Sequence, residues 1–428
     1  MIDAKIDGVI NCQFELSRRA AIFWVTSIFL FSLILAAPTR YFLGNGPFAQ
    51  LIYLPKILLI LTMPLTLRLS MRGIVNSILF VFVLSFSFIR GIFNLPNAEQ
   101  SFFELWVLVP LVYGFLVAPY LIDDLARYKN ILVILFCIAS VGVLLNPFVN
   151  YPWVGANIDI AGVSVEISRQ WTTFGLERFG GFSQASYSAA SQLVIISILL
   201  TCLARQSIGK VIMWIVAGVC IVLTTSKGAF AAYILLVLFY ASSYLMRRNN
   251  LWKLGWSALL FIVLIFVMLL PLTVLFVHYD PHFTSFASKF LLKSFGERLT
   301  WMWPDSLGLL STPFDWLIGR GLGGIGIPLL YFNHGKSSLL GADNLFVYLA
   351  VIFGPFLAAI FLLSLYFRGI ILLLFNKRGD LIFSILLYIA TYGLVMNMLE
   401  EAASSLFLGL AIGYIAHSGW FRNGRACQ

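Results

Sequence analysis

The sequence predicts an all-α protein, a polytopic membrane bundle of about twelve transmembrane helices that forms one integral-membrane domain over residues 1–428. Composition is the first reason, because 61% of the residues are hydrophobic and only 11% are charged. A soluble domain is usually about a quarter charged, so this chain has too little polar surface to cover itself in water. Long apolar stretches recur along the whole chain, and basic residues separate them.

Each apolar stretch is interpreted as a helix that crosses the bilayer. About 17 to 25 apolar residues cross the hydrocarbon core, and a backbone in lipid must satisfy its own hydrogen bonds, which favours helices. The first stretch ends in Ala36-Ala37-Pro38 and imitates a signal peptide, but many spans follow, so we expect an uncleaved helix. The expected spans are 21–37, 48–67, 73–91, 102–122, 130–148, 186–204, 209–225, 229–246, 254–277, 344–366, 381–398 and 402–417.

Lysines and arginines determine the expected orientation. Cytoplasmic connections of membrane proteins are enriched in these residues, and more than half of the 28 in this chain fall near the termini and in alternate connections. Both termini are therefore expected in the cytoplasm, with the chain in a bacterial inner membrane. The net charge of +10 is spread along the chain and forms no patch, so nucleic acid is not an expected partner.

Two of the expected outward connections are long. The first covers 149–185, and the second covers 278–343 between the ninth and tenth spans. The second contains many aromatic residues and a glycine-rich run, so we expect short helices that lie on the outer membrane surface. The five cysteines and four histidines show no metal-ligand spacing, and neither a metal nor another cofactor is expected.

Several cations are expected on the outward side, where positive charge runs against the usual bias. Arginine binds phosphate oxygens in pairs, and lysine adds a point charge. An outward basic site would suit a lipid-linked pyrophosphate, whereas contacts with lipid headgroups or solvent are the alternative. The candidates for pyrophosphate binding are Arg169, Arg178, Lys227, Arg298 and Arg320.

Candidate acids and bases lie near the same side. Asp343 directly precedes the tenth span, where a carboxylate can accept the proton of an attacking hydroxyl and can also cap the helix. His334 lies nine residues earlier and is the second candidate for the base. Glu400 and Glu401 follow the eleventh span, and we expect them to pair with loop arginines or to bind a sugar. Lys56, within the second span, is expected to extend its amine toward the outer surface.

Four motifs follow one another in the second half of the chain. The segment 178–190 reads Arg-Phe-Gly-Gly-Phe at its start, and 223–229 reads Leu-Thr-Thr-Ser-Lys-Gly-Ala. The run 319–324 is Gly-Arg-Gly-Leu-Gly-Gly, and 343–349 begins Asp-Asn-Leu before Gly354. In their order, spacing and side of the membrane, these motifs resemble the O-antigen polymerase and O-antigen ligase superfamily over about 178 to 366.

This resemblance implies a glycosyltransferase that acts outside the membrane. Ligases of the superfamily carry a histidine where this chain has Asp343, which favours a polysaccharide polymerase. Such an enzyme would take undecaprenyl-pyrophosphate-linked oligosaccharide as donor and acceptor and would invert the configuration of the transferred sugar. Membrane lipid is an expected partner, and the resemblance also allows for a chain-length regulator protein. The first outer loop, near 38–47, contains no acid, which favours a metal-independent reaction.

Two alternatives remain open at this point. One is the ligase of the same superfamily, which would transfer the glycan to lipid A-core. The other is a membrane transporter or flippase for lipid-linked oligosaccharide, since twelve spans would fit a carrier equally well. The long outer loop and the outward cations favour an enzyme, because a carrier more often places its ionisable residues within the membrane.

Overall fold

The computed structural model describes residues 2–44, 46–66, 71–160, 163–169, 171–173, 175–203, 207–246, 251–280, 285–332, 342–376 and 378–417. The protein is mostly helical, with 78% helix and 4% strand. The first half of the fold contains α1 (Ile2–Ile34), α2 (Ala36–Gly44), η1 (Ala49–Tyr53), α3 (Leu54–Thr66), α4 (Met71–Asn94), α5 (Ala98–Val107), α6 (Val109–Asp123), η2 (Leu125–Tyr128), α7 (Lys129–Leu145), α8 (Ser186–Leu203) and α9 (Ser207–Leu223).

The second half contains α10 (Lys227–Leu245), α11 (Leu251–Leu272), η3 (Thr273–Leu275), α12 (Phe286–Glu297), the π-helical turn η4 (Arg298–Met302), α13 (Trp303–Gly308), α14 (Pro313–Ile318), α15 (Ile327–Phe332), α16 (Leu345–Phe353), α17 (Pro355–Phe375), α18 (Gly379–Gly393) and α19 (Ala402–His417). Within the described residues, nine helical segments are long and apolar enough to cross a membrane. Three shorter apolar helices are 208–223, 379–393 and 402–417.

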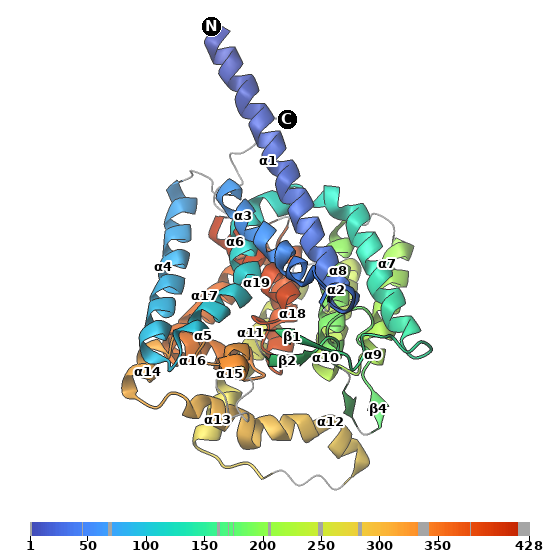
Figure 1. The fold of residues 1–428 in the computed structure, drawn as a ribbon, viewed down its shortest axis with the longest axis vertical. Coiled ribbons are helices and arrows are strands. Elements are labelled where there is room, and N and C mark those ends of the chain that lie inside the picture. Colours follow the sequence, from blue (N-terminus) through green and yellow to red (C-terminus); the bar gives the residue numbers. More distant parts are fainter. Residues whose placement is uncertain are drawn as a thin grey trace.

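The centre of the bundle is formed by helices whose backbones approach closely. A Cβ atom on Gly114 of α6 would lie 2.1 Å from the carbonyl oxygen of Leu406, and one on Gly409 of α19 would lie 2.1 Å from that of Leu111. Small residues permit this approach, which favours helix association where lipid supplies no hydrophobic drive. Figure 1 shows α6 and α19 inside the bundle, with α4 and α7 on opposite sides of it.

Polar contacts tie several helix ends together at one end of the bundle. Arg19 of α1 binds Asp124 at 2.9 Å, and Arg378 donates to the carbonyl oxygen of Ile122. The amide of Asn76, near the start of α4, donates to the carbonyl oxygen of Ala416 at 2.6 Å. These contacts gather segments that the sequence assigns to one side of the membrane.

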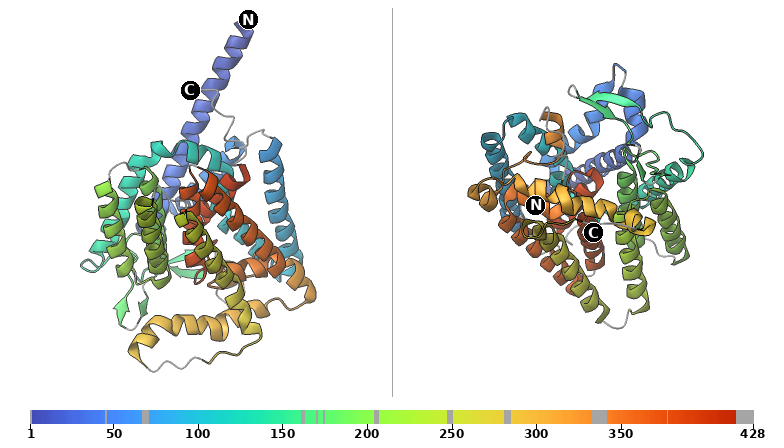
Figure 2. Two further views of the ribbon diagram at one scale, coloured as in Figure 1. Left: turned by 180° about the vertical axis from the view of Figure 1, so that it is seen from behind. Right: turned by 90° about the horizontal axis from the view of Figure 1, so that it is seen from below.

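The other end carries the two segments that were expected as long loops. Figures 1 and 2 show α12 and α13 lying across this end, crosswise to the long helices. The segment 149–185 contains two short antiparallel hairpins, β1 (Asn157–Ile160) with β2 (Val163–Glu166) and β3 (Thr172–Thr173) with β4 (Leu176–Glu177). No strand was expected in an all-α fold. The runs are too short for the alternation of polar and apolar residues to indicate them.

The tenth expected span, 344–366, is wrong in its boundaries. The buried helix α16 ends at Gly354, whose φ of 88° breaks it, and Pro355 begins the longer helix α17. A Cβ atom on Gly354 would lie 2.4 Å from the carbonyl oxygen of Leu317. The apolar sequence hides this break, because both helices have the composition of a single span.

Candidate functional site

Arg298 connects three segments at the end of the bundle that α12 covers. Its Nη1 donates to the carbonyl oxygen of Ser294 at 2.7 Å. Its Nη2 donates to Asp343 Oδ2 and to the carbonyl oxygen of Val395, each at 2.9 Å. Only 14% of the arginine side chain is exposed. The guanidinium is therefore held in place by α12, by the segment before α16 and by the α18–α19 connection.

The sequence suggested that Asp343 caps the helix that follows it, but the structure shows that it does not. The cap of α16 is Asn344, which accepts a hydrogen bond from the Val347 amide at 3.0 Å. The Asn344 amide also donates to the carbonyl oxygens of Val267 and Leu394, at 3.3 and 3.1 Å. Asp343 itself has a φ of 40°, in the left-handed region. Its carboxylate accepts the hydrogen bond from Arg298.

The surroundings of Asp343 affect its protonation. Its side chain remains 40% exposed, yet nearby protein atoms remove enough hydration to raise the pKa of its carboxyl. The positive charge of Arg298, and the hydrogen bond from it, limit that increase in pKa. A carboxylate with a raised pKa that still contacts water has the properties of a general base.

Two further cations lie near Arg298. Lys227, at the start of α10, donates to the carbonyl oxygen of Phe290 in α12, and its Nζ lies 4.4 Å from the centre of the Phe290 ring. The charges of both Arg178 and Arg298 act on it. Burial lowers the pKa of Arg178, and the charge of Arg298 lowers it further. Arg178, Lys227, Arg298 and Asp343 together are called the charged centre below.

Arg169 lies at the edge of the charged centre. The Arg169 and Arg178 guanidinium carbons lie 5.8 and 5.9 Å from the centre of the Trp171 ring. Tyr187 lies at the start of α8. The groups whose charges act on its phenol include Arg169, Asp343, Glu400 and Glu401. Tyr187 therefore lies within electrostatic reach of both Arg169 and these acids.

The structure gives Arg320 different partners. Its Nη1 donates to the carbonyl oxygen of Gly324 at 3.4 Å, and the carboxylate of Asp315 acts on its charge. None of its contacts with the described residues links it to the charged centre. A Cβ atom on Gly321 would lie 2.2 Å from the Gly91 nitrogen, so the glycine-rich run packs against backbone and has a structural role. His334 lies outside the described residues.

The two adjacent glutamates accept backbone hydrogen bonds, and no ion pair among the described residues reaches either of them. Glu400 Oε1 accepts from the Ile327 amide at 2.6 Å, beside Gly326. Glu401 accepts from Ala403 and Ser404 at 3.3 and 2.6 Å, in the first turn of α19. Neither glutamate therefore pairs with a loop arginine within the described residues, and the alternative, that they bind a sugar, stays a prediction.

Sequence reasoning missed Glu104. Glu104 of α5 is fully buried, accepts a hydrogen bond from the phenol of Tyr348, and lies within electrostatic reach of Glu400. Lys56 donates to the carbonyl oxygen of Trp106 at 3.3 Å, and its expected extension toward the outer surface stays a prediction. A single glutamate in an otherwise apolar stretch was the available signal for Glu104, since such residues are rare in spans.

The protonation of Glu400 gives a testable prediction. Burial raises the pKa of Glu400 to about 7 from an ordinary value of 4.5, although the Ile327 amide opposes this. The native state therefore binds more protons than the unfolded state between these two values, so stability falls as pH rises through this window. We expect the melting temperature in detergent to fall from pH 5 to pH 8. The Glu400→Gln variant should show a smaller fall; an equal one would contradict the assignment.

Comparison with protein-family models gives no match, and comparison with curated proteins gives no significant match. No group of three or more His, Cys, Asp or Glu side chains in the described residues is placed to hold a metal ion. The resemblance to the O-antigen enzymes therefore depends on the motifs of the chain itself. Three of those motifs and the segment containing Arg298 each contribute one residue to the charged centre.

Proposed function

We propose that the protein is a polysaccharide polymerase of the O-antigen type. It transfers a growing glycan from undecaprenyl pyrophosphate onto a new lipid-linked repeat unit at the periplasmic face of the inner membrane. The charged centre carries the proposal, because three cations and one carboxylate from distant parts of the sequence meet there. Cations suit a pyrophosphate leaving group, and the carboxylate suits an attacking hydroxyl.

In the proposed reaction, an acceptor hydroxyl attacks the anomeric carbon of the donor glycan. The new carbon–oxygen bond forms as the bond to the pyrophosphate oxygen breaks, so the configuration inverts. The hydroxyl proton passes to Asp343, and the leaving electron pair stays on undecaprenyl pyrophosphate. Arg178, Lys227 and Arg298 stabilise the charge that develops there. These residues alone provide the acid–base and electrostatic roles.

The proposal includes twelve spans in a bacterial inner membrane, with both termini in the cytoplasm. The nine long and three shorter apolar helices support this number. Sidedness is supported by the polar contacts of Arg19, Asn76 and Arg378, which lie at one end of the bundle. The segments 149–185 and 278–343 would then lie outside, where lipid-linked repeats are presented.

Labelling of single cysteines tests this topology. In a cysteine-free background, an impermeant maleimide should label intact cells at Lys289→Cys, which is exposed on α12. It should not label Arg127→Cys, which has 52% of its side chain exposed at the other end. Disrupted cells should give both signals, which controls for reactivity. If only Arg127→Cys is labelled in intact cells, the proposed orientation is wrong and the opposite orientation holds.

One observation favours a transporter as the second candidate. Glu104 and Lys56 place ionisable groups among apolar helices, and such residues often mark ion or proton pathways. The lipopolysaccharide of a deletion strain separates the functions. Core capped with one repeat indicates the polymerase. Bare core with polymer on its carrier indicates a ligase, and bare core with repeats trapped in the cytoplasm indicates a flippase.

A further inference from the structure

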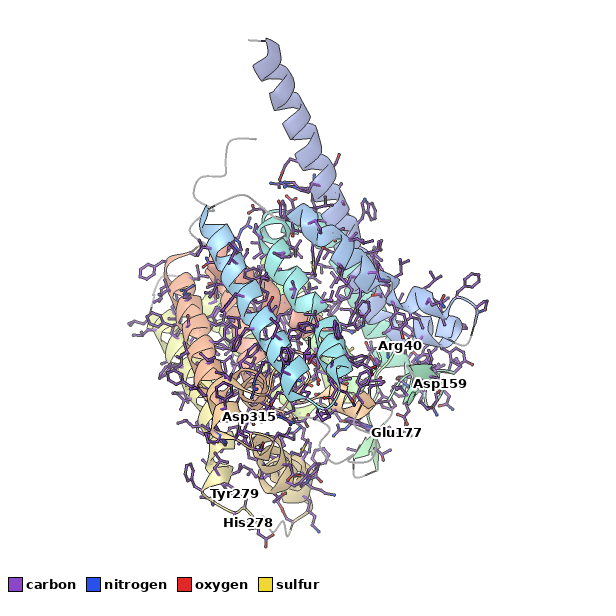
Figure 3. The ribbon with its side chains drawn as sticks, turned by 60° about the vertical axis from the view of Figure 1, so that its left-hand side comes forward. Arg40, Asp159, Glu177, His278, Tyr279 and Asp315 are labelled. Carbon is purple, nitrogen blue, oxygen red and sulfur yellow. The ribbon has the colours of Figure 1, made fainter. Side chains whose placement is uncertain are left out.

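A second pair of cations lies outside the charged centre. Arg40 belongs to α2 and Lys56 to α3, and the charge of Arg40 acts on Lys56. Neither forms an ion pair within the part of the chain that the structure describes. The Nη1 atom of Arg40 is buried and has no hydrogen-bond partner. Figure 3 shows Arg40 on the same side of the molecule as Asp159, well away from Asp315.

Three phenol groups lie within electrostatic reach of Arg40. The phenols of Tyr53, Tyr187 and Tyr331 are the groups that act on the charge of Arg40. Tyr53 is 39% exposed, and its ring packs against that of Trp106 with the centres 6.0 Å apart. Guanidinium, ammonium and phenol groups all donate hydrogen bonds. The set therefore presents donors to an anion with several oxygen atoms.

The charge of this pair is only partly compensated. Burial lowers the pKa of Arg40, because its charged form loses hydration that no ion pair replaces. The carboxylate of Glu104 acts on Lys56, but no acid of the described residues is among the groups that act on the charge of Arg40. Two like charges held together in protein cost free energy unless an opposite charge joins them. A phosphate group carries that charge and matches the donors.

We propose that Arg40 and Lys56 form a second phosphate-binding site, which holds the pyrophosphate of the second lipid-linked substrate. This inference rests on the proposed function, because polymerisation joins two lipid-linked molecules and only one pyrophosphate leaves. The charged centre holds the leaving pyrophosphate, and the Arg40–Lys56 pair holds the one that stays attached. The charge of Arg169 acts on Tyr187 and Tyr331, both of which also act on Arg40.

Ligand stoichiometry tests this proposal without requiring catalysis. The full-length protein in phosphatidylcholine nanodiscs is titrated with farnesyl pyrophosphate, and bound ligand is counted. Wild type should bind two molecules. The Arg40→Gln, Lys56→Gln double variant should bind one, as should Arg298→Gln. Arg127→Gln, at the opposite end, is the matched control and should bind two. Melting curves verify that each variant is folded. If the double variant is misfolded, the single Lys56→Gln variant is used in its place. We expect that single variant to bind the second molecule at least tenfold more weakly than wild type.

The outcomes distinguish this site from the proposed function. If the double variant binds two molecules, or if Lys56→Gln used in its place binds the second molecule with unchanged affinity, the second site is overturned. The proposal for the charged centre would still stand. One molecule in the double variant and two in Arg298→Gln would support the second site while contradicting the placement of the first. Inorganic pyrophosphate that binds as tightly as farnesyl pyrophosphate would indicate a free-anion site. Phosphatidylglycerol retained at the expense of one farnesyl pyrophosphate would indicate a headgroup site. Either result would overturn the assignment to a lipid-linked substrate.

Discussion

Replacing Arg298 with glutamine will slow polymer formation by a folded protein at least a hundredfold. The guanidinium contacts Asp343 and the carbonyl oxygens of Val395 and Ser294, so its position is fixed before substrate binds. Loss of one fixed group that stabilises developing negative charge costs about 10²- to 10³-fold in rate. The measurement is polymerisation by purified variants in detergent, with lipid-linked repeats as substrate and no added metal.

Two variants show whether the effect belongs to the guanidinium. Arg298→Lys should recover only part of the rate, because lysine keeps the charge but cannot donate two hydrogen bonds in a fixed plane. Lys289→Gln removes an exposed positive charge from the neighbouring helix α12 and should polymerise normally. If Arg298→Gln makes polymer at the wild-type rate, the leaving pyrophosphate does not bind at the charged centre.

The helical class could be predicted because composition and the length of apolar stretches are properties of the sequence alone. The same signal could not show where a stretch breaks. Gly354 ends α16 because its backbone lies against Leu317, a contact between residues that are far apart in the chain. The hairpins at 157–166 and 172–177 are also short, and local propensity gives little information at that length.

The site could be predicted where charge appeared in an unusual place. Arg178, Lys227, Arg298 and Asp343 were all candidates from the sequence, and the structure places them near one another, while their roles stay predictions. Arg320 shared the same sequence signal but has other partners. Sequence position could not separate these cases, because the distinction depends on which segments pack against Asp315 and which against Val395.

The residues that were missed have contacts that only tertiary structure creates. Glu104 accepts a hydrogen bond from Tyr348, which belongs to a distant helix. Arg40 lies within electrostatic reach of Tyr331, although most of the sequence separates the two residues. The capping residue was misassigned by one position, since Asp343 and Asn344 have similar capping preferences. The backbone decides between them. Asp343 adopts a φ of 40°, whereas Asn344 has the extended conformation of a cap.

The Asp343→Asn variant should lose most activity and keep its helix. Asparagine tolerates the left-handed conformation of this position, and Asn344 still caps α16. The variant loses the proton acceptor, and loss of general-base help typically costs about 10²- to 10⁴-fold in rate. Because burial raises the pKa of Asp343, the wild-type rate should increase with pH as the carboxyl group loses its proton. The residual rate of the variant should lack that increase.

Comparison with Asp343→Ala and Asp343→Glu completes the test, again with purified protein and lipid-linked repeats. Alanine should be as inactive as asparagine, and its extra loss of stability should be about 1 kcal/mol, from the positive φ alone. Glutamate should recover part of the activity, because it restores a carboxylate near Arg298. A structural role for Asp343 predicts the opposite order, with asparagine close to wild type and glutamate impaired. That order would exclude Asp343 as the base and direct attention to His334, which lies outside the described residues, and to Glu400.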